Sequence, residues 1–144
     1  MQRFLIVLIF LVVGALPAHA LTPEQAGRIA AGDSDDRVAA LNEVVATADP
    51  ALEPFVKALL DDTVKTSAGK AYIARDGKAV EAASGAPAAL PADAEDAVNN
   101  NRMRGELESA IAVLQLVSPD RAVRAAAIAE LKDQVDEGKL GLID

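Results

Sequence analysis

The sequence contains no cysteine and no tryptophan, and few other aromatic residues. Without cysteine, the chain can form neither a disulfide nor a thiolate metal site. Three phenylalanines and one tyrosine are present, and Phe55 is the only phenylalanine after residue 20. The hydrophobic fraction of 51% therefore depends heavily on alanine. Such a composition favours closely packed helices over a deep sheet core.

Histidine is nearly absent as well. The only one, His19, lies within a predicted export signal, so the rest of the chain offers no imidazole as a base, nucleophile relay or metal ligand. Carboxylate, lysine, serine and tyrosine side chains remain, but no pair of them is spaced for acid–base or nucleophilic catalysis. We therefore interpret the protein as non-catalytic and expect no cofactor or metal.

Basic residues are fewer than acidic ones. The chain has 14 Lys and Arg against 22 Asp and Glu, which gives a net charge of −8 and a pI of about 4.6. An acidic surface repels nucleic-acid phosphates and anionic lipid, so we expect no nucleic-acid partner. The acidic residues are dispersed, which is typical of a solubilising surface. We also expect no direct small-molecule site.

The first twenty residues are typical of a cleavable export signal. Arg3 provides a basic start, Phe4–Leu16 is apolar apart from one glycine, and Ala18-His19-Ala20 matches a cleavage site after Ala20. The apolar run is shorter than the roughly 20 residues of a spanning helix, although an uncleaved anchor is the alternative. We expect an exported, periplasmic protein that is either free or held at the inner membrane.

Residues 21–62 show the pattern of a helical hairpin region. Thr22, followed by Pro23 and Gln25, predicts a capped helix start. The acidic run at residues 33–36 offers caps for a second helix, and Asp49 precedes a third. The short connection between the second and third helices predicts antiparallel packing of the two.

The helical period disappears over residues 63–92, which we interpret as a loop with a β-hairpin. Asp76-Gly77 separates the strand-like runs Ala71–Ala74 and Lys78–Glu81, and Asp-Gly is a strong hairpin signal. Residues 84–91 are rich in alanine, glycine and proline, as expected of a loop.

Residues 93–144 are predicted to form a C-terminal helical pair. The helical pattern returns near Asp93, and residues 107–117 carry one apolar stripe. Ser118-Pro119-Asp120 predicts a turn and a new helix cap. The spacing of Asp120, Val123 and the residues up to Leu131 is similar to the second helix of HEAT-like repeats.

The predicted fold class is therefore mostly α, with HEAT-like antiparallel helical hairpins and a small inserted β-hairpin. Two short motifs have simpler explanations than a site. Asp33, Asp35 and Asp36 lack the glycine and distal glutamate of a calcium loop, so helix capping explains them better. Ser67-x-x-Lys70 matches a serine-nucleophile pattern but lacks its companion motifs, so we attribute it to chance.

Three consecutive asparagines and two arginines precede the strongest helical pattern. One interpretation is a surface cluster near a helix start. The other is a partner interface, because asparagine and arginine make directional contacts at modest desolvation cost. On the second interpretation, the candidate partner contacts are Asn100, Asn101, Arg102 and Arg104.

Three motifs together carry a family resemblance: Val98–Arg104, Leu116–Asp120 and Val123-Arg124-x-x-Ala127. They resemble the exported N-terminal region of the urea-type ABC transporter permease subunit, a relative of the branched-chain amino acid permeases. Pro17–Thr22 and Asp36–Leu41 fit the same pattern. The similarity covers most of the chain and is strongest over residues 98–127, with Met103 where the family pattern has leucine.

The resemblance implies a module that assists urea transmembrane transport through protein–protein contacts. Its implied partners are the membrane subunits or the binding protein of the ABC transporter. The family's permease continues into many membrane-spanning helices, whereas no apolar run of about 20 residues follows residue 20 here. We therefore expect a fragment or a separately encoded leading module. The alternative function is a free-standing periplasmic helical-repeat adaptor that binds another protein.

Overall fold

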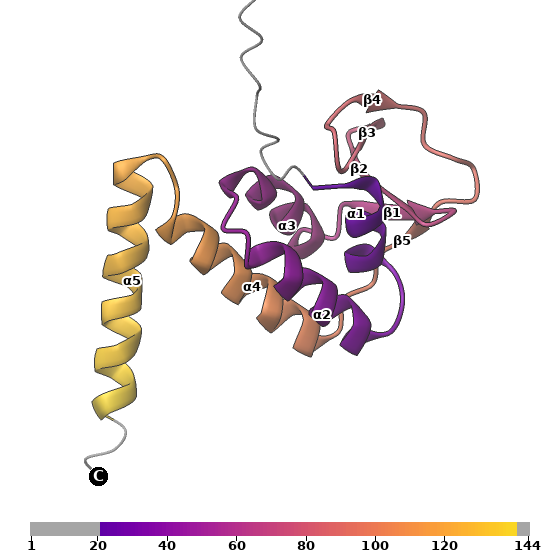
Figure 1. Ribbon diagram of the computed structural model, residues 1–144. Coiled ribbons are helices and arrows are strands. Elements are labelled where there is room, and N and C mark those ends of the chain that lie inside the picture. The colour runs from indigo at the N-terminus through magenta and orange to yellow at the C-terminus, as the bar shows by residue number, and fades with distance from the viewer. Residues whose placement is uncertain (1–20, 141–144) are drawn as a thin grey trace, which may run out of the picture.

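The computed structural model describes the backbone of residues 21–140 and the side chains of residues 21–133. This part of the chain combines five α-helices with a five-stranded antiparallel sheet (Figure 1). The fold is mixed α/β, so the prediction of a mostly α protein with a small inserted hairpin is wrong. The predicted signal, residues 1–20, lies outside the described residues.

The sheet is inserted between the third and fourth helices. The helices before it are α1 (Pro23–Ala30), α2 (Ser34–Val45) and α3 (Glu53–Leu60), with a 3-10 turn at Pro50–Leu52. The strands are β1 (Val64–Ser67), β2 (Lys70–Arg75), β3 (Lys78–Glu81), β4 (Pro87–Ala88) and β5 (Glu95–Asp96). The helices after it are α4 (Asn101–Leu116) and α5 (Arg121–Leu140).

The local signals at the first helix starts are confirmed. Thr22 and Gln25 form a reciprocal capping box, with the Gln25 backbone N–H donating to Thr22 Oγ1 over 3.2 Å. Asp49 accepts from the backbone N–H of Ala51 at 2.9 Å and starts the 3-10 turn. Asp33 is the N-cap residue of α2, although its side chain makes no capping hydrogen bond.

The helices pack around α4 and do not form stacked hairpins. Helix α3 packs mainly on α4, α2 packs equally on α1 and α4, and α1 also packs on the sheet. The buried face of α4 contributes Met103, Leu107, Ala110 and Leu114 to one core cluster. Helices α2 and α3 therefore do not form the expected HEAT-like pair, because both pack on α4, a helix distant in sequence, rather than mainly on each other.

Two tight turns with left-handed residues form the first two hairpins of the sheet. At the β2–β3 turn, Asp76 and Gly77 have φ of 52° and 74°, so the hairpin predicted from Asp-Gly is confirmed. The β1–β2 turn uses the same left-handed geometry at Ala68 and Gly69, with φ of 48° and 74°. Alanine rarely adopts this conformation, so Ala68-Gly69 is not a recognisable hairpin signal in the sequence.

The strand order is β4-β3-β2-β1-β5. Residues 89–94 therefore connect opposite edges of the sheet, and β5 lies where a helical pattern had been expected. Helix α1 packs on β1 and β2, and the buried Val64 and Ala71 join the helical core from this sheet. The sheet is thus part of the core rather than a peripheral insertion.

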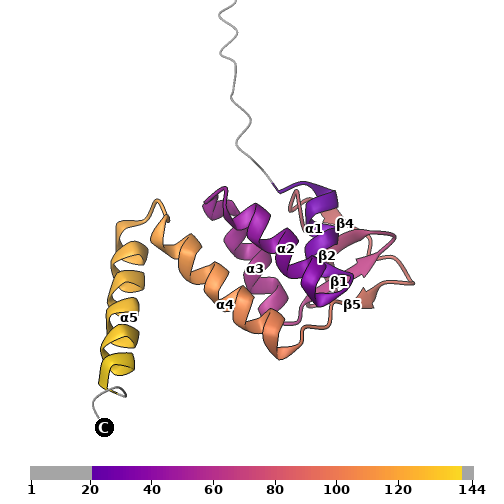
Figure 2. The same cartoon turned by 60° about the horizontal axis from the view of Figure 1, so that its bottom comes forward.

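Helix α5 stands apart from this core. Figures 1 and 2, which differ by a rotation, both show it diverging from α4 on the side away from the sheet. It packs mainly on α4, where Ala127 is buried at 6% exposure, and Ala127 is not part of the core cluster. Over the range that the structure describes, no helix combines the length and apolar character needed to cross a bilayer.

Replacing two helical glycines with alanine should change the free energy of unfolding in opposite directions. A Cβ at Gly27 would lie 1.9 Å from the backbone oxygen of Gly69, so Gly27→Ala must push the β1–β2 turn away from α1. We expect it to lower the free energy of unfolding by about 1–3 kcal/mol. A Cβ at Gly105 would meet nothing within 4 Å, so Gly105→Ala should raise that free energy by about 0.5–1 kcal/mol.

Urea denaturation of the mature chain, followed by circular dichroism, measures both changes. The same sign for the two substitutions would contradict the close approach of α1 and the β1–β2 turn.

Candidate functional site

The four candidate partner contacts lie at the start of α4. Asn100 is the N-cap residue: its Oδ1 accepts from the Met103 backbone N–H at 2.8 Å. Its Nδ2 donates to Ser34 Oγ at 2.7 Å, which ties the start of α4 to the start of α2. Asn101 follows as an exposed first residue of the helix.

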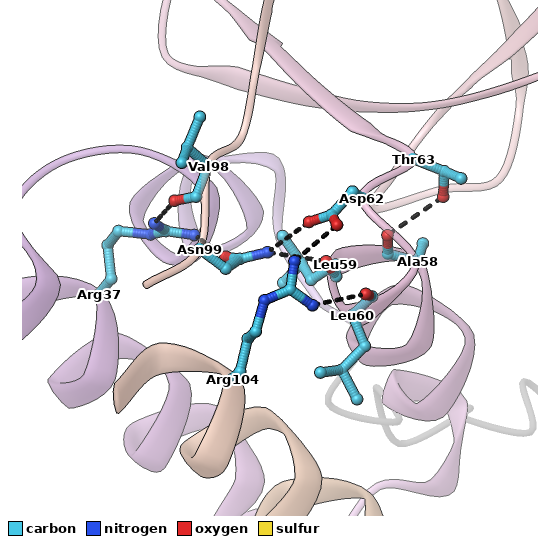
Figure 3. Close-up of polar contacts among 9 residues, drawn as sticks. All are labelled: Arg37, Ala58, Leu59, Leu60, Asp62, Thr63, Val98, Asn99 and Arg104. Atoms are coloured by element: carbon cyan, nitrogen blue, oxygen red, sulfur yellow. Dashed lines mark hydrogen bonds and ion pairs between the residues drawn. The ribbon is translucent and has the colours of Figure 1, made fainter. Parts of the chain in front are cut away.

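The two arginines pair with acidic residues of other helix ends. Arg102 pairs with Asp35 at the start of α2, and both side chains are largely exposed. Arg104 Nη2 donates to Asp62 Oδ2 at 2.6 Å, and its Nη1 donates to the Leu60 backbone oxygen at 3.2 Å (Figure 3). These contacts favour the first interpretation, a cluster of side chains that holds the start of α4 in place. A partner role for the four residues stays a prediction.

The central polar residue is one that the sequence did not single out. Arg37 of α2 is only 4% exposed and donates three hydrogen bonds to neutral oxygens. The acceptors are Ile29 O at 2.8 Å, Val98 O at 2.7 Å and Asn99 Oδ1 at 2.6 Å. None of the ion pairs among the described side chains includes Arg37. Its charge is therefore stabilised by amide and carbonyl dipoles alone.

Burial lowers the pKa of the Arg37 guanidinium from its ordinary value. An arginine starts from so high a pKa that it remains charged at physiological pH. Its acceptor Ile29 O belongs to the last turn of α1, where unsatisfied carbonyls and the helix dipole favour a cation. Arg37 thus caps α1 and holds the segment between β5 and α4.

Asn99 extends this network to α3. It is 9% exposed, and its Nδ2 donates to Leu59 O at 2.7 Å and to Asp62 Oδ1 at 3.5 Å (Figure 3). One side chain therefore accepts from Arg37 and donates to the end of α3. Local sequence could not reveal these contacts, because the partners lie far apart in the chain.

The end of α3 contains a strained residue. Asp62 has φ of 56°, a left-handed conformation usually taken by glycine at a helix end. The backbone N–H groups of Asp62 and Thr63 donate to Leu59 O and Ala58 O, as in a Schellman motif. The Asp62 carboxylate accepts from Arg104 and Asn99, which explains an aspartate where glycine would be less strained.

An open hollow of about 640 Å³ lies over the sheet, between the strands and the segment after β4. Its apolar lining includes Ala74, Ala79 and Leu90. Two cations at its rim already have partners, since Lys65 pairs with Asp96 and Arg75 with Asp61. Asp76 and Lys78 also line the hollow, and both are exposed at the β2–β3 turn. The hollow is therefore an open, largely apolar surface with charged residues at its rim.

Exposed apolar side chains gather instead on the C-terminal helices. Val113 of α4 is 43% exposed, and Val117, the C-cap residue of that helix, is 41% exposed. On α5, Ile128 is 52% exposed and Leu131 is 36% exposed. Leu90 and Val98 are the other large apolar side chains that are exposed among the described residues. A group of such residues on two adjacent helices is typical of a protein contact surface.

The turn between α4 and α5 is firmly built. Asp120 caps α5 by accepting from the Ala122 backbone N–H at 2.7 Å, which confirms the predicted cap. Arg124 Nη1 donates to Ser118 O at 2.6 Å and to Pro119 O at 3.0 Å. These bonds fix the direction in which α5 leaves the core.

Comparison with known proteins leaves the family open. No protein-family model matches the sequence, and neither a curated protein nor a solved structure matches it. The resemblance to the urea-type permease region therefore enters below only as a proposal.

Replacing Arg37 should be far more costly than replacing Arg102. Arg37→Met removes the donor to the Ile29 and Val98 carbonyls and to the buried Asn99 amide oxygen, so we expect a loss of about 3 kcal/mol or more in the free energy of unfolding. Arg102→Met is the matched control, since it breaks only an exposed ion pair worth less than about 1 kcal/mol. Chemical denaturation of both variants tests this, and equal losses would refute the role of Arg37.

Two substitutions of Asp62 separate the effect of backbone strain on stability from the effect of losing the ion pair with Arg104. Asp62→Ala and Asp62→Gly both remove the carboxylate that Arg104 contacts, but only glycine tolerates φ of 56° without strain. We expect the glycine variant to be more stable than the alanine variant by about 1 kcal/mol. Thermal denaturation at matched concentration measures the difference, and a more stable alanine variant would rule out the left-handed helix end.

Proposed function

We propose that this protein is an exported, non-catalytic module that acts by binding another protein. The observation that carries the proposal is the placement of α5. A fixed turn directs this helix away from the core, and its Ile128 and Leu131 are exposed. Leu131 lines one groove together with the exposed Val113 of α4. Within the described chain, these side chains have no larger element to cover them.

The proposed partner comes from the sequence. The motifs Val98–Arg104 and Leu116–Asp120 resemble the N-terminal region of a urea-type ABC transporter permease subunit. We propose that the module contacts membrane subunits or the binding protein of such a transporter and thereby assists urea uptake. The polar groups of the first motif support the core, which leaves the α4–α5 surface as the better location for that contact.

Deleting the gene should lower urea uptake by its host, measured with labelled urea at low external concentration. Wild-type complementation should restore uptake, whereas Ile128→Arg should not, because a charge replaces an exposed apolar contact at a modest cost in stability. Val98→Arg is the matched control on another surface, since Val98 is 77% exposed, and it should restore uptake.

A pull-down of the tagged mature chain from host membranes identifies the partner directly. Recovery of urea-transporter subunits by the wild type and by Val98→Arg, but not by Ile128→Arg, is the expected pattern. Unchanged uptake after deletion would refute a role in urea transport, and specific recovery of unrelated periplasmic proteins would favour an adaptor for another system.

A further inference from the structure

A groove of about 640 Å³ lies between α4 and α5 and reaches the end of α3. Most of the side chains that line the groove are apolar or small, and none of those described is basic. The lining residues that carry the argument are Leu60, Gly105, Glu108, Leu116, Glu130 and Leu131. The groove thus offers an apolar surface with only acidic side chains as its ionisable groups.

The two acidic residues lie on different helices. Glu108 belongs to α4 and Glu130 to α5, and both are exposed. Neither takes part in an ion pair among the described side chains, unlike Glu53, which pairs with Lys57 at 2.6 Å. A ligand in the groove would therefore meet a carboxylate from each helix beside an apolar surface.

A glycine marks the place where a ligand can approach α4 closely. Gly105 lines the groove within the helix, although glycine weakens a helix interior relative to alanine. No part of the described chain needs its small size, since a Cβ there would meet nothing within 4 Å. Close approach by a partner backbone accounts for a residue that internal packing does not explain.

We propose that this groove binds an amphipathic helix of a partner protein, with lysine or arginine on both flanks of its apolar stripe. The apolar stripe would pack on Leu116 and Leu131 and pass close to Gly105, and the basic flanks would pair with Glu108 and Glu130. Such a helix would complete a three-helix layer with α4 and α5. A second copy of this chain is a poorer occupant, because its net charge of −8 opposes self-association. The inference rests on the proposed function only in taking the partner to be a protein.

Two synthetic helical peptides provide the probe. Both carry leucine at positions i, i+3, i+4 and i+7, and the flanking positions are lysine in one peptide and glutamate in the other. Fluorescence anisotropy measures their binding to the complete mature chain at low and moderate salt. We expect the lysine peptide to bind at least about tenfold more tightly, with the difference shrinking as salt rises.

Charge reversal in the groove should reverse this preference. The double variant Glu108→Lys/Glu130→Lys should bind the glutamate peptide more tightly than the lysine peptide. The matched control is Glu95→Lys/Glu106→Lys, which changes the net charge equally at positions that do not line the groove, and it should keep the wild-type preference. Gly105→Leu should weaken binding of the lysine peptide by about tenfold or more, because its side chain fills the groove. Circular dichroism checks that each variant is folded.

Several results would overturn the proposal. These are failure of the lysine peptide to bind the folded wild type, equal binding of the two peptides, and an equal shift in the control double variant. Dimerisation of the wild type that Gly105→Leu abolishes would instead assign the groove to a second copy. If the charge reversal succeeds but urea uptake is unaffected by deletion, the groove assignment stands and the transporter function fails. The opposite result leaves the transporter function in place with a different contact surface.

Discussion

The fold depends on a buried cation that pairs with no carboxylate among the described side chains. The Arg37 guanidinium joins the end of α1, the Val98 backbone and the Asn99 side chain, and Asn99 carries the connection to the end of α3. A buried arginine is costly unless it is hydrogen-bonded, and each of the three Arg37 nitrogens donates one bond. This arrangement therefore tolerates little displacement of the segment before α4. Since α4 contacts both α2 and α3, its position also determines how the helical core closes.

Charge in this acidic protein is used mainly at helix ends. Arg37 and Arg104 donate to carbonyls in the last turns of α1 and α3, where the helix dipole favours cations. Arg102 pairs with an aspartate at the start of α2. The basic residues near the start of α4 therefore organise the core, whereas Glu108 and Glu130 line the groove between α4 and α5 and take part in no ion pair among the described side chains. This division separates the stabilising charges from those proposed to bind a partner.

The sheet and α5 have different relations to this core. The sheet contributes Val64 and Ala71 to the buried cluster, and the contact between Gly27 and Gly69 leaves no room for a larger residue between α1 and the first hairpin. Among the described side chains of α5, only Ala127 is buried, and Arg124 holds the turn before the helix. A helix that adds little to the core yet has a fixed direction is suited to contact with another protein.

The sequence by itself determined the features that arise from neighbouring residues. The Thr22–Gln25 capping box, the Asp76-Gly77 hairpin turn, the Asp120 cap and the apolar stripe of α4 follow from local backbone chemistry and helical periodicity. Only the tertiary structure decided that α2 and α3 meet on α4, that five strands form one sheet, and that Arg37 reaches Asn99. These outcomes depend on which distant surfaces bury one another and which distant donors satisfy buried acceptors. The periodicity of one segment contains neither kind of information.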